Sequence, residues 1–270
     1  IVPLLQGVHQ VAPRIASESL RSSLTSIIRA AGKPENVHCS LDYLMENPGT
    51  EGRKLVEDYL GALSPEAIPS IVDLFDQMEE ELVLPLFQKA VVELCGGDPF
   101  RLRPGLEHRR WKVVKATSQV LSRIRSPDSL KLFEPLLKHE SHFIRQTAVR
   151  SLVKHGSRRA GQILEPLLHD PSSAVRVVTI ESFASLDAAD AFDRLVTILE
   201  SDSFADRDRQ EQQVLYRVLA KFGGDKIIRG LASQVGTDST PWFQRTSRTL
   251  LAITSLIALI SWPILTATMG

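Results

Sequence analysis

A pattern that repeats every 31 residues limits the folds open to this sequence more than any other feature does. Three stretches of the chain align without gaps, and the same columns hold large apolar residues in each of them. The columns are Leu121, Leu152 and Phe183; Leu136, Leu167 and Ile198; and Leu137, Leu168 and Leu199. A period of this length is typical of proteins that stack many copies of one small structural unit.

Each repeat has the sequence pattern of two helices. Ser141, Ser172 and Ser203 keep the 31-residue step, and serine at such a position accepts hydrogen bonds from the first turn of a helix. Apolar residues then recur at helical spacing, as Val149 and Leu152 do. One hairpin of two helices cannot bury its apolar stripe alone, so neighbouring hairpins must stack.

The pattern extends in both directions. Downstream, steps of 36 residues continue the apolar columns, and upstream Pro65 and Pro127 lie 62 residues apart, which is two periods. The sequence therefore predicts an all-α solenoid of antiparallel helix hairpins with about 31 residues per repeat. We expect residues 51–270 to form the repeat array and residues 1–50 to form a helical segment without an assigned role.

Residues 109–124 and 142–186 resemble HEAT repeats, particularly the short repeats of bacterial proteins. Arg145 and Arg176 match the basic residue that opens the first helix of a HEAT unit. The resemblance implies a right-handed superhelix that acts as a non-enzymatic scaffold and binds another protein through its concave surface. It does not identify that protein, because a repeat consensus records packing rather than chemistry.

Charge is distributed unevenly along a chain whose net charge is zero. Residues 1–100 hold 7 Lys and Arg against 15 Asp and Glu, a net of −8. Residues 101–159 hold 15 against 4, a net of +11, and residues 160–270 hold 10 against 13, a net of −3. We call residues 101–159 the basic band. Such a concentration of one sign of charge favours an oppositely charged partner.

We expect the basic band to bind an acidic segment of another protein, with arginine forks and one aromatic residue as anchors. The candidate partner-binding residues are Arg101, Arg103, Arg109, Arg110, Trp111, Lys112, Lys115, Arg145 and Arg150. Two other interpretations stay open. In one, these charges pair with acidic turns of neighbouring repeats and Trp111 belongs to the core. In the other, the acidic first hundred residues, including 79–81, face the band.

Nucleic acid is an alternative partner, because a basic surface also attracts phosphates. Some HEAT-like proteins are alkylpurine DNA glycosylases, and that activity would use Trp111 together with Glu107 or Glu134. The zero net charge of the chain argues against a dedicated nucleic-acid-binding protein.

The sequence contains no motif that assigns a catalytic residue, a metal or a cofactor. HEAT-like iron hydroxylases bind metal through several His-Glu pairs, whereas this chain has the single pair His139–Glu140. Its two cysteines, Cys39 and Cys95, imply no disulfide framework. They favour a reducing compartment, and we expect a cytoplasmic protein.

Residues 249–270 carry no charged side chain and have two interpretations. As a membrane span, the stretch is long enough to cross a bilayer, and Arg245 and Arg248 flank it as they would on a cytoplasmic side. The protein would then be an adaptor tethered to a membrane. As a last, incomplete repeat, its apolar residues form one helical stripe, and Pro263 opens a second helix as Pro127 does. We favour the incomplete repeat.

Overall fold

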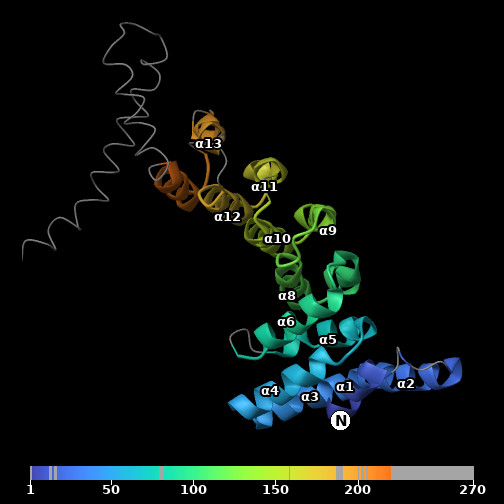
Figure 1. Cartoon of the computed structure of the whole chain (residues 1–270). Helices are drawn as coiled ribbons and strands as arrows, with labels where there is room; N and C mark the ends of the chain where they lie inside the picture. The colour runs from blue at the N-terminus through green and yellow to red at the C-terminus, as the bar shows by residue number, and fades with distance from the viewer. Residues whose placement is uncertain are drawn as a thin grey trace, which may run out of the picture. The chain divides into compact units, whose positions relative to one another are not determined.

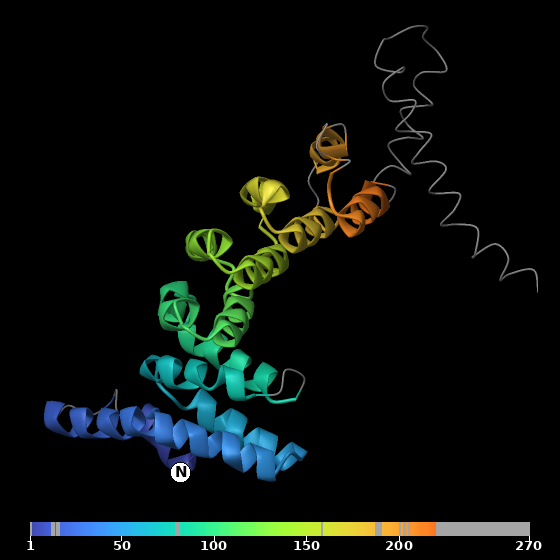
Figure 2. The same cartoon turned by 180° about the vertical axis from the view of Figure 1, so that it is seen from behind.

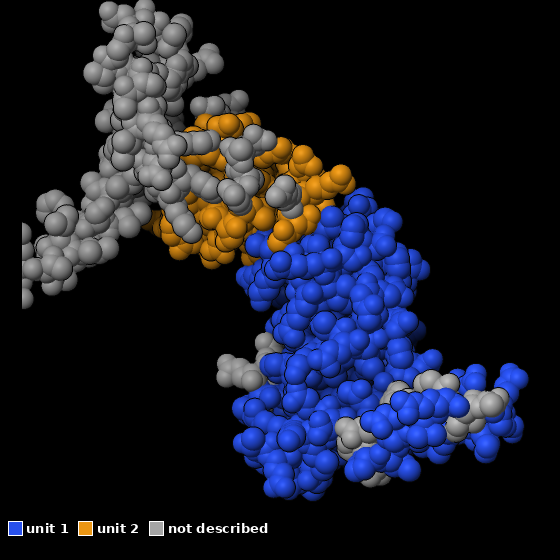
Figure 3. All heavy atoms as spheres, viewed as in Figure 1, with its two compact units in different colours: residues 1–155 blue, residues 156–270 orange. Residues whose placement is uncertain are grey.

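The computed structural model describes residues 2–11, 14, 17–78, 82–157, 159–186, 191–199, 201, 204 and 206–219. Their regular elements are α-helices and short 3-10 helices, and none of these residues lies in a β-strand. The chain divides into two compact units, unit 1 (residues 1–155) and unit 2 (residues 156–270), which Figure 3 colours separately. The prediction of an all-α solenoid of helix hairpins is confirmed.

Unit 1 begins with helices that precede the repeats recognised in the sequence. These are α1 (Val2–Val11), α2 (Glu18–Ala31) and α3 (Pro34–Glu46). Leu5, Val8 and Ile28 form a small buried cluster with Ala62 of the following segment. The hydroxyl of Tyr59 donates to the carbonyl of Ala31 at 2.6 Å, which ties this cluster to the first hairpin of the array.

Helix hairpins then stack along unit 1. Their first helices are α4 (Thr50–Gly61), α6 (Leu84–Cys95), α8 (Trp111–Leu121) and α10 (His142–His155). Each of these helices packs against the next in that order, and α8 and α10 are neighbours in both views of the molecule (Figures 1 and 2). We call this series the first-helix row.

The second half of each hairpin is shorter and more often broken. It consists of η2 (Pro65–Ala67), α5 (Ile68–Asp73) and η3 (Phe75–Gln77); then η4 (Pro99–Leu102) and α7 (Arg103–Leu106); and then α9 (Pro127–Leu137). Pro65, Pro99 and Pro127 each occupy the first position of such a segment, where proline costs no hydrogen bond. The two periods expected between Pro65 and Pro127 therefore exist, as unequal steps of 34 and 28 residues.

The apolar columns of the repeat form the core of both units. The buried members are Leu121, Leu136, Leu137 and Leu152 in unit 1, and Leu167, Leu168, Phe183 and Ile198 in unit 2. Leu199 is half-buried. Because burying a side chain of this kind contributes about 1.5–3 kcal/mol, these columns are a main source of stability.

Close packing also fixes one glycine in unit 1. A Cβ atom on Gly105 of α7 would lie 2.4 Å from Cγ1 of Val72 in α5 and 2.5 Å from Oγ1 of Thr117 in α8. The second half of this hairpin therefore approaches its neighbours as closely as a backbone without a side chain allows.

Unit 2 continues the same plan within residues 156–219. It contains α11 (Ala160–Leu164), η5 (Glu165–His169), α12 (Ser173–Phe183) and α13 (Ala191–Leu199), and residues 209–219 are also helical. The Nη1 atom of Arg194 in α13 forms an ion pair with Glu165 of η5.

The predicted serine caps mark helix starts. Helix α10 begins directly after Ser141, whose carbonyl accepts from the N–H groups of Ile144 and Arg145. Ser172 is the N-cap of α12, but its hydroxyl makes no capping hydrogen bond, so its contribution is conformational. Ser203 lies outside the described residues.

The interpretations of residues 249–270 concern a part of the chain outside the described residues, as does the acidic run 79–81. Within the described ranges, no helix combines the length and the apolar character that a bilayer crossing requires.

Candidate protein-binding surface

Trp111 lies on the surface at the first position of α8. Its side chain is 45% exposed, and its ring stacks on that of Phe143, which is 55% exposed, with 6.0 Å between ring centroids and 28° between planes. Phe143 lies in the first turn of α10, so the two rings come from neighbouring hairpins. The interpretation of Trp111 as a core residue is therefore wrong.

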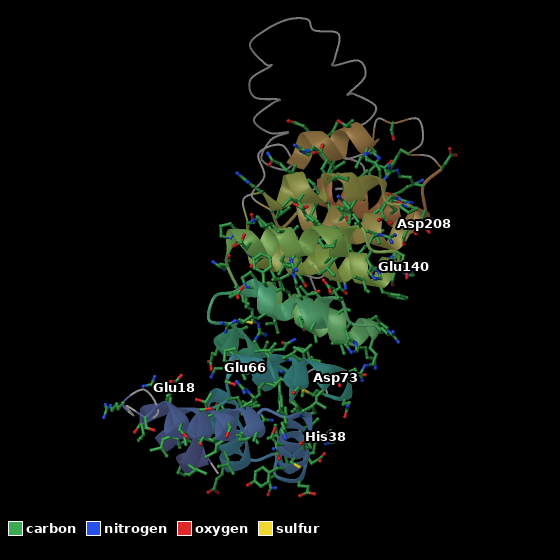
Figure 4. The ribbon with its side chains drawn as sticks, turned by 90° about the vertical axis from the view of Figure 1, so that its right-hand side faces the viewer. Glu18, His38, Glu66, Asp73, Glu140 and Asp208 are labelled. Carbon is green, nitrogen blue, oxygen red and sulfur yellow. The ribbon has the colours of Figure 1, made fainter. Side chains whose placement is uncertain are left out.

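Arg110, one residue earlier, forms contacts within the protein. Its Nη1 donates to both carboxylate oxygens of Asp76, at 3.0 and 2.8 Å, and its Nη2 donates to the carbonyl of Asp73 at 3.1 Å. His108 also contacts the carboxylate of Asp73, which is labelled in Figure 4. Arg110 thus joins the start of α8 to the end of the hairpin that begins with α4, in agreement with the interpretation of charge pairing between repeats.

Arg145 is a buried residue in the first turn of α10, and its side chain reaches back to the turn between α9 and α10. Its Nη1 donates to the carbonyls of His139 and Glu140 at 2.7 and 2.8 Å (Glu140 is labelled in Figure 4). In unit 2, Nη1 of Arg176 donates in the same way to the carbonyl of Asp170 at 2.7 Å. The arginine of the repeat consensus therefore satisfies carbonyls at the end of the preceding hairpin, and only 9% of Arg145 is exposed to a partner.

Arg101 and Arg103 lie in the second-helix segments η4 and α7. Nη1 of Arg101 donates to the carbonyl of Leu94 at 3.0 Å, and its Nε lies 3.5 Å from the carboxylate of Asp98. Arg103 places its guanidinium 5.2 Å from the ring centroid of Phe100, a cation–π contact. Both side chains remain exposed, but they are held by local contacts.

The other candidates lie at the beginning of α8 or on α10. Arg109, Lys112 and Arg150 are exposed, and Lys115 is half-buried. Lys112 and Lys115 line a hollow of about 70 Å³ together with Phe75, Asp76, Met78, Leu84, Ala116 and Gln119. Arg109, Trp111 and Lys112 therefore lie at the amino-terminal end of α8, and Arg150 lies further along α10.

Phe143 is the surface residue that the candidate list lacks. It follows Trp111 by 32 residues, one more than the repeat period, so the repeat places both rings at the starts of successive first helices. The signal was present in the sequence, but the repeat alignment used buried columns and did not compare exposed positions.

The histidines near this surface have local contacts. Nδ1 of His139 accepts from the N–H of Ser141 at 3.0 Å, and the ring of His142 lies 4.1 Å from that of Phe143. Within the part of the chain that the structure describes, no group of three or more His, Cys, Asp or Glu side chains could hold a metal. Burial raises the pKa of the Cys95 thiol to about 11, so this cysteine is a core thiol rather than a nucleophile.

The fold and this surface define a helical-repeat protein built from stacked hairpins. Residues 101–184 match the family model of HEAT repeats, in agreement with the resemblance seen in the sequence. A comparison with curated protein sequences returns no match.

Solved structures similar to this chain include engineered proteins. One has 17% identity and a TM-score of 0.43, with 73% of this chain and 95% of that chain covered. A second has 18% identity and a TM-score of 0.36, with coverage of 91% and 78%. A third has 16% identity and a TM-score of 0.34, with coverage of 81% and 97%.

Proposed function

We propose that this protein is a non-enzymatic scaffold that binds an acidic segment of another protein through the exposed part of the basic band in unit 1. The observation that carries the proposal is the exposed stack of Trp111 on Phe143, with the basic side chains Arg109, Lys112 and Arg150 on the same two helices or directly before them. HEAT repeats at residues 101–184 support it, because such repeats generally mediate contacts between proteins.

The nine candidates have different roles in this proposal. Arg109, Trp111, Lys112 and Arg150 would contact the partner. Arg110 and Arg145 would act by positioning. The guanidinium of Arg110 holds Asp76 of η3 beside the start of α8, and that of Arg145 holds the turn that precedes α10. Arg101, Arg103 and Lys115 would add positive charge at the edge of the surface.

Acidic side chains that pair with the basic band favour a protein partner over nucleic acid. Asp73 and Asp76 neutralise Arg110 next to the exposed aromatic rings. A phosphate backbone that followed this surface would be repelled by these carboxylates. We therefore place the nucleic-acid and glycosylase alternatives second, and we keep the cytoplasm as the proposed location.

The test is capture of partner proteins with a charge-reversed variant. Arg109→Glu, Lys112→Glu and Arg150→Glu together should abolish capture of partners that the wild-type chain retains, without loss of helicity by circular dichroism. The matched control reverses Lys131 and Lys138, which lie on or directly after α9, and should capture normally. Equal capture by all three chains would contradict the proposal.

A further inference from the structure

Helices α8 and α10 present a continuous exposed face. Lys112 is exposed in the first turn of α8, and Arg123 is exposed in the turn that follows the end of this helix. On α10, Phe143, Arg150 and Lys154 are exposed at spacings of seven and four residues, which keep one side of the helix. Because α8 and α10 are neighbours in the first-helix row, these residues line one two-helix surface.

The two ends of this surface differ in chemistry. The stacked rings of Trp111 and Phe143 lie at the amino-terminal end of both helices. Arg123, Arg150 and Lys154 lie toward the carboxyl-terminal end. Nη2 of Arg123 donates to Oε1 of Gln88 at 3.3 Å, which restrains this guanidinium on the surface.

No acid neutralises this surface from its own helices. Neither α8 (WKVVKATSQVL) nor α10 (HFIRQTAVRSLVKH) contains an Asp or Glu. By contrast, α9 carries Asp128 and Glu134, and Asp128 pairs with Lys131. The exposed basic residues of α8 and α10 are therefore not opposed by an acid on either of these two helices.

We propose that this surface recognises a two-part segment of the partner protein: an apolar residue on the Trp111–Phe143 stack and acidic residues that pair with Arg123, Arg150 and Lys154. This inference rests on the proposed function and specifies its ligand. From Phe143 to Lys154 the helix rises about 16 Å, so an extended segment of about five residues joins the two parts.

Exposed aromatic rings and arginines are the residue types that dominate binding energy at protein interfaces, which supports an anchor at each end. A single-stranded nucleic acid would instead use aromatic platforms spaced along a basic groove. Here the aromatic side chains occupy one end only, so a segment with separated apolar and acidic parts fits better.

The first experiment compares synthetic peptides by fluorescence anisotropy on the full chain. The block peptide, of about nine residues to span the surface in extended form, has two leucines at one end and four glutamates at the other. The interleaved peptide has the same composition with the two leucines placed between glutamates, and a third peptide replaces the leucines by serine. We expect the block peptide to bind at least about tenfold more tightly than either of the others.

Substitutions test which residues of the protein bind the apolar part and which bind the acidic part of the peptide. Trp111→Ala and Phe143→Ala should each weaken the block peptide to the affinity of the leucine-free peptide. Phe100→Ala removes an exposed aromatic ring from η4 and should leave binding unchanged. Arg150→Glu with Lys154→Glu should reduce binding of every acidic peptide, whereas Lys131→Glu with Lys138→Glu should change it at most about twofold.

The outcomes separate this inference from the proposed function. Equal affinity for the block and interleaved peptides overturns the two-part recognition but leaves an acidic partner. Absence of binding to all three peptides by the folded chain contradicts both. Preference for a DNA oligonucleotide of equal charge assigns the surface to nucleic acid and overturns both. A dimer that Trp111→Ala converts to a monomer assigns the surface to a second copy of this chain and overturns the inference.

Discussion

Arg176 and Glu211 form a bidentate ion pair between successive hairpins of unit 2. Nε of Arg176 donates to Oε1 of Glu211 at 2.9 Å, and Nη2 donates to Oε2 at 2.6 Å. Glu211 is fully buried and also accepts from Nη1 of Arg207 at 2.5 Å. Two guanidinium groups therefore depend on one buried carboxylate.

Glu211→Ala should destabilise unit 2 strongly. The substitution leaves Arg176 and Arg207, which are 16% and 10% exposed, without their carboxylate, and breaking such a buried pair costs about 3–5 kcal/mol. Urea unfolding followed by circular dichroism measures the change. Arg217→Ala is the control: it breaks the exposed pair with Glu181, and the free energy of unfolding should change by less than about 1 kcal/mol. Similar losses in the two variants would contradict the assigned role of Glu211.

His155 should make unit 1 less stable at acid pH. Burial, beside the ring of Phe133, lowers the pKa of His155, so the folded state favours the neutral imidazole. The unfolded chain binds the proton at its ordinary pKa of about 6.5. The stabilising contribution is therefore complete above that pH and is lost as the pH falls through it.

The measurement is the urea midpoint of the wild-type chain and of His155→Phe between neutral and mildly acid pH. The wild-type midpoint should fall more steeply than that of the variant, which keeps the aromatic bulk but cannot be protonated. The other histidines are present in both chains, so parallel curves would show that His155 does not contribute.

Gly105→Ala should destabilise unit 1 by overpacking. The added methyl group would overlap Val72 and Thr117, and such insertions cost about 1–3 kcal/mol. Gly61→Ala is the matched control, because a Cβ atom at this last position of α4 meets nothing within 4 Å, and alanine favours helix over glycine by at most about 1 kcal/mol. Thermal melting should move down for the first variant and up for the second. An unchanged melting temperature for Gly105→Ala would show that α5 and α8 move apart at little cost.

Arg110 and Lys112 should separate stability from binding. Arg110→Ala removes the contacts with Asp73 and Asp76, and we expect it to cost about 1 kcal/mol, because the pair is partly exposed to solvent. Lys112→Ala should leave the melting temperature unchanged and weaken the block peptide. A binding defect without loss of stability in Arg110→Ala would instead place that arginine in contact with the partner.

The repeat made the fold predictable because packing residues obey a period. Leu121 and Leu152 occupy the same position in successive repeats, so they were expected to have the same degree of burial. Both are fully buried. Unequal hairpin steps were not predictable, since loops change length without disturbing the columns. This is why Pro99, which opens the second half of the intervening hairpin, does not divide the separation of Pro65 and Pro127 equally.

The binding surface was less predictable than the fold, because a basic residue in the sequence does not show whether it pairs with an acidic residue of the same chain. Arg110 and Lys112 look alike in the sequence, yet only a contact with Asp73 and Asp76 distinguishes them. Nothing in the sequence placed these carboxylates beside Arg110, since side-chain direction depends on how successive hairpins stack. Hydrophobicity alone could not place Trp111 either, because a large aromatic residue suits both a core and an interface.

The Trp111–Phe143 stack exists only where two hairpins meet. Neither hairpin contains the whole site. A fragment with only one of them would present a single ring and only part of the basic residues. A ligand that occupies both halves would hold the two hairpins together, and its affinity would then report whether this junction is intact. Binding would thus depend on correct assembly of the two hairpins, and a chain misfolded at this junction would not bind its partner.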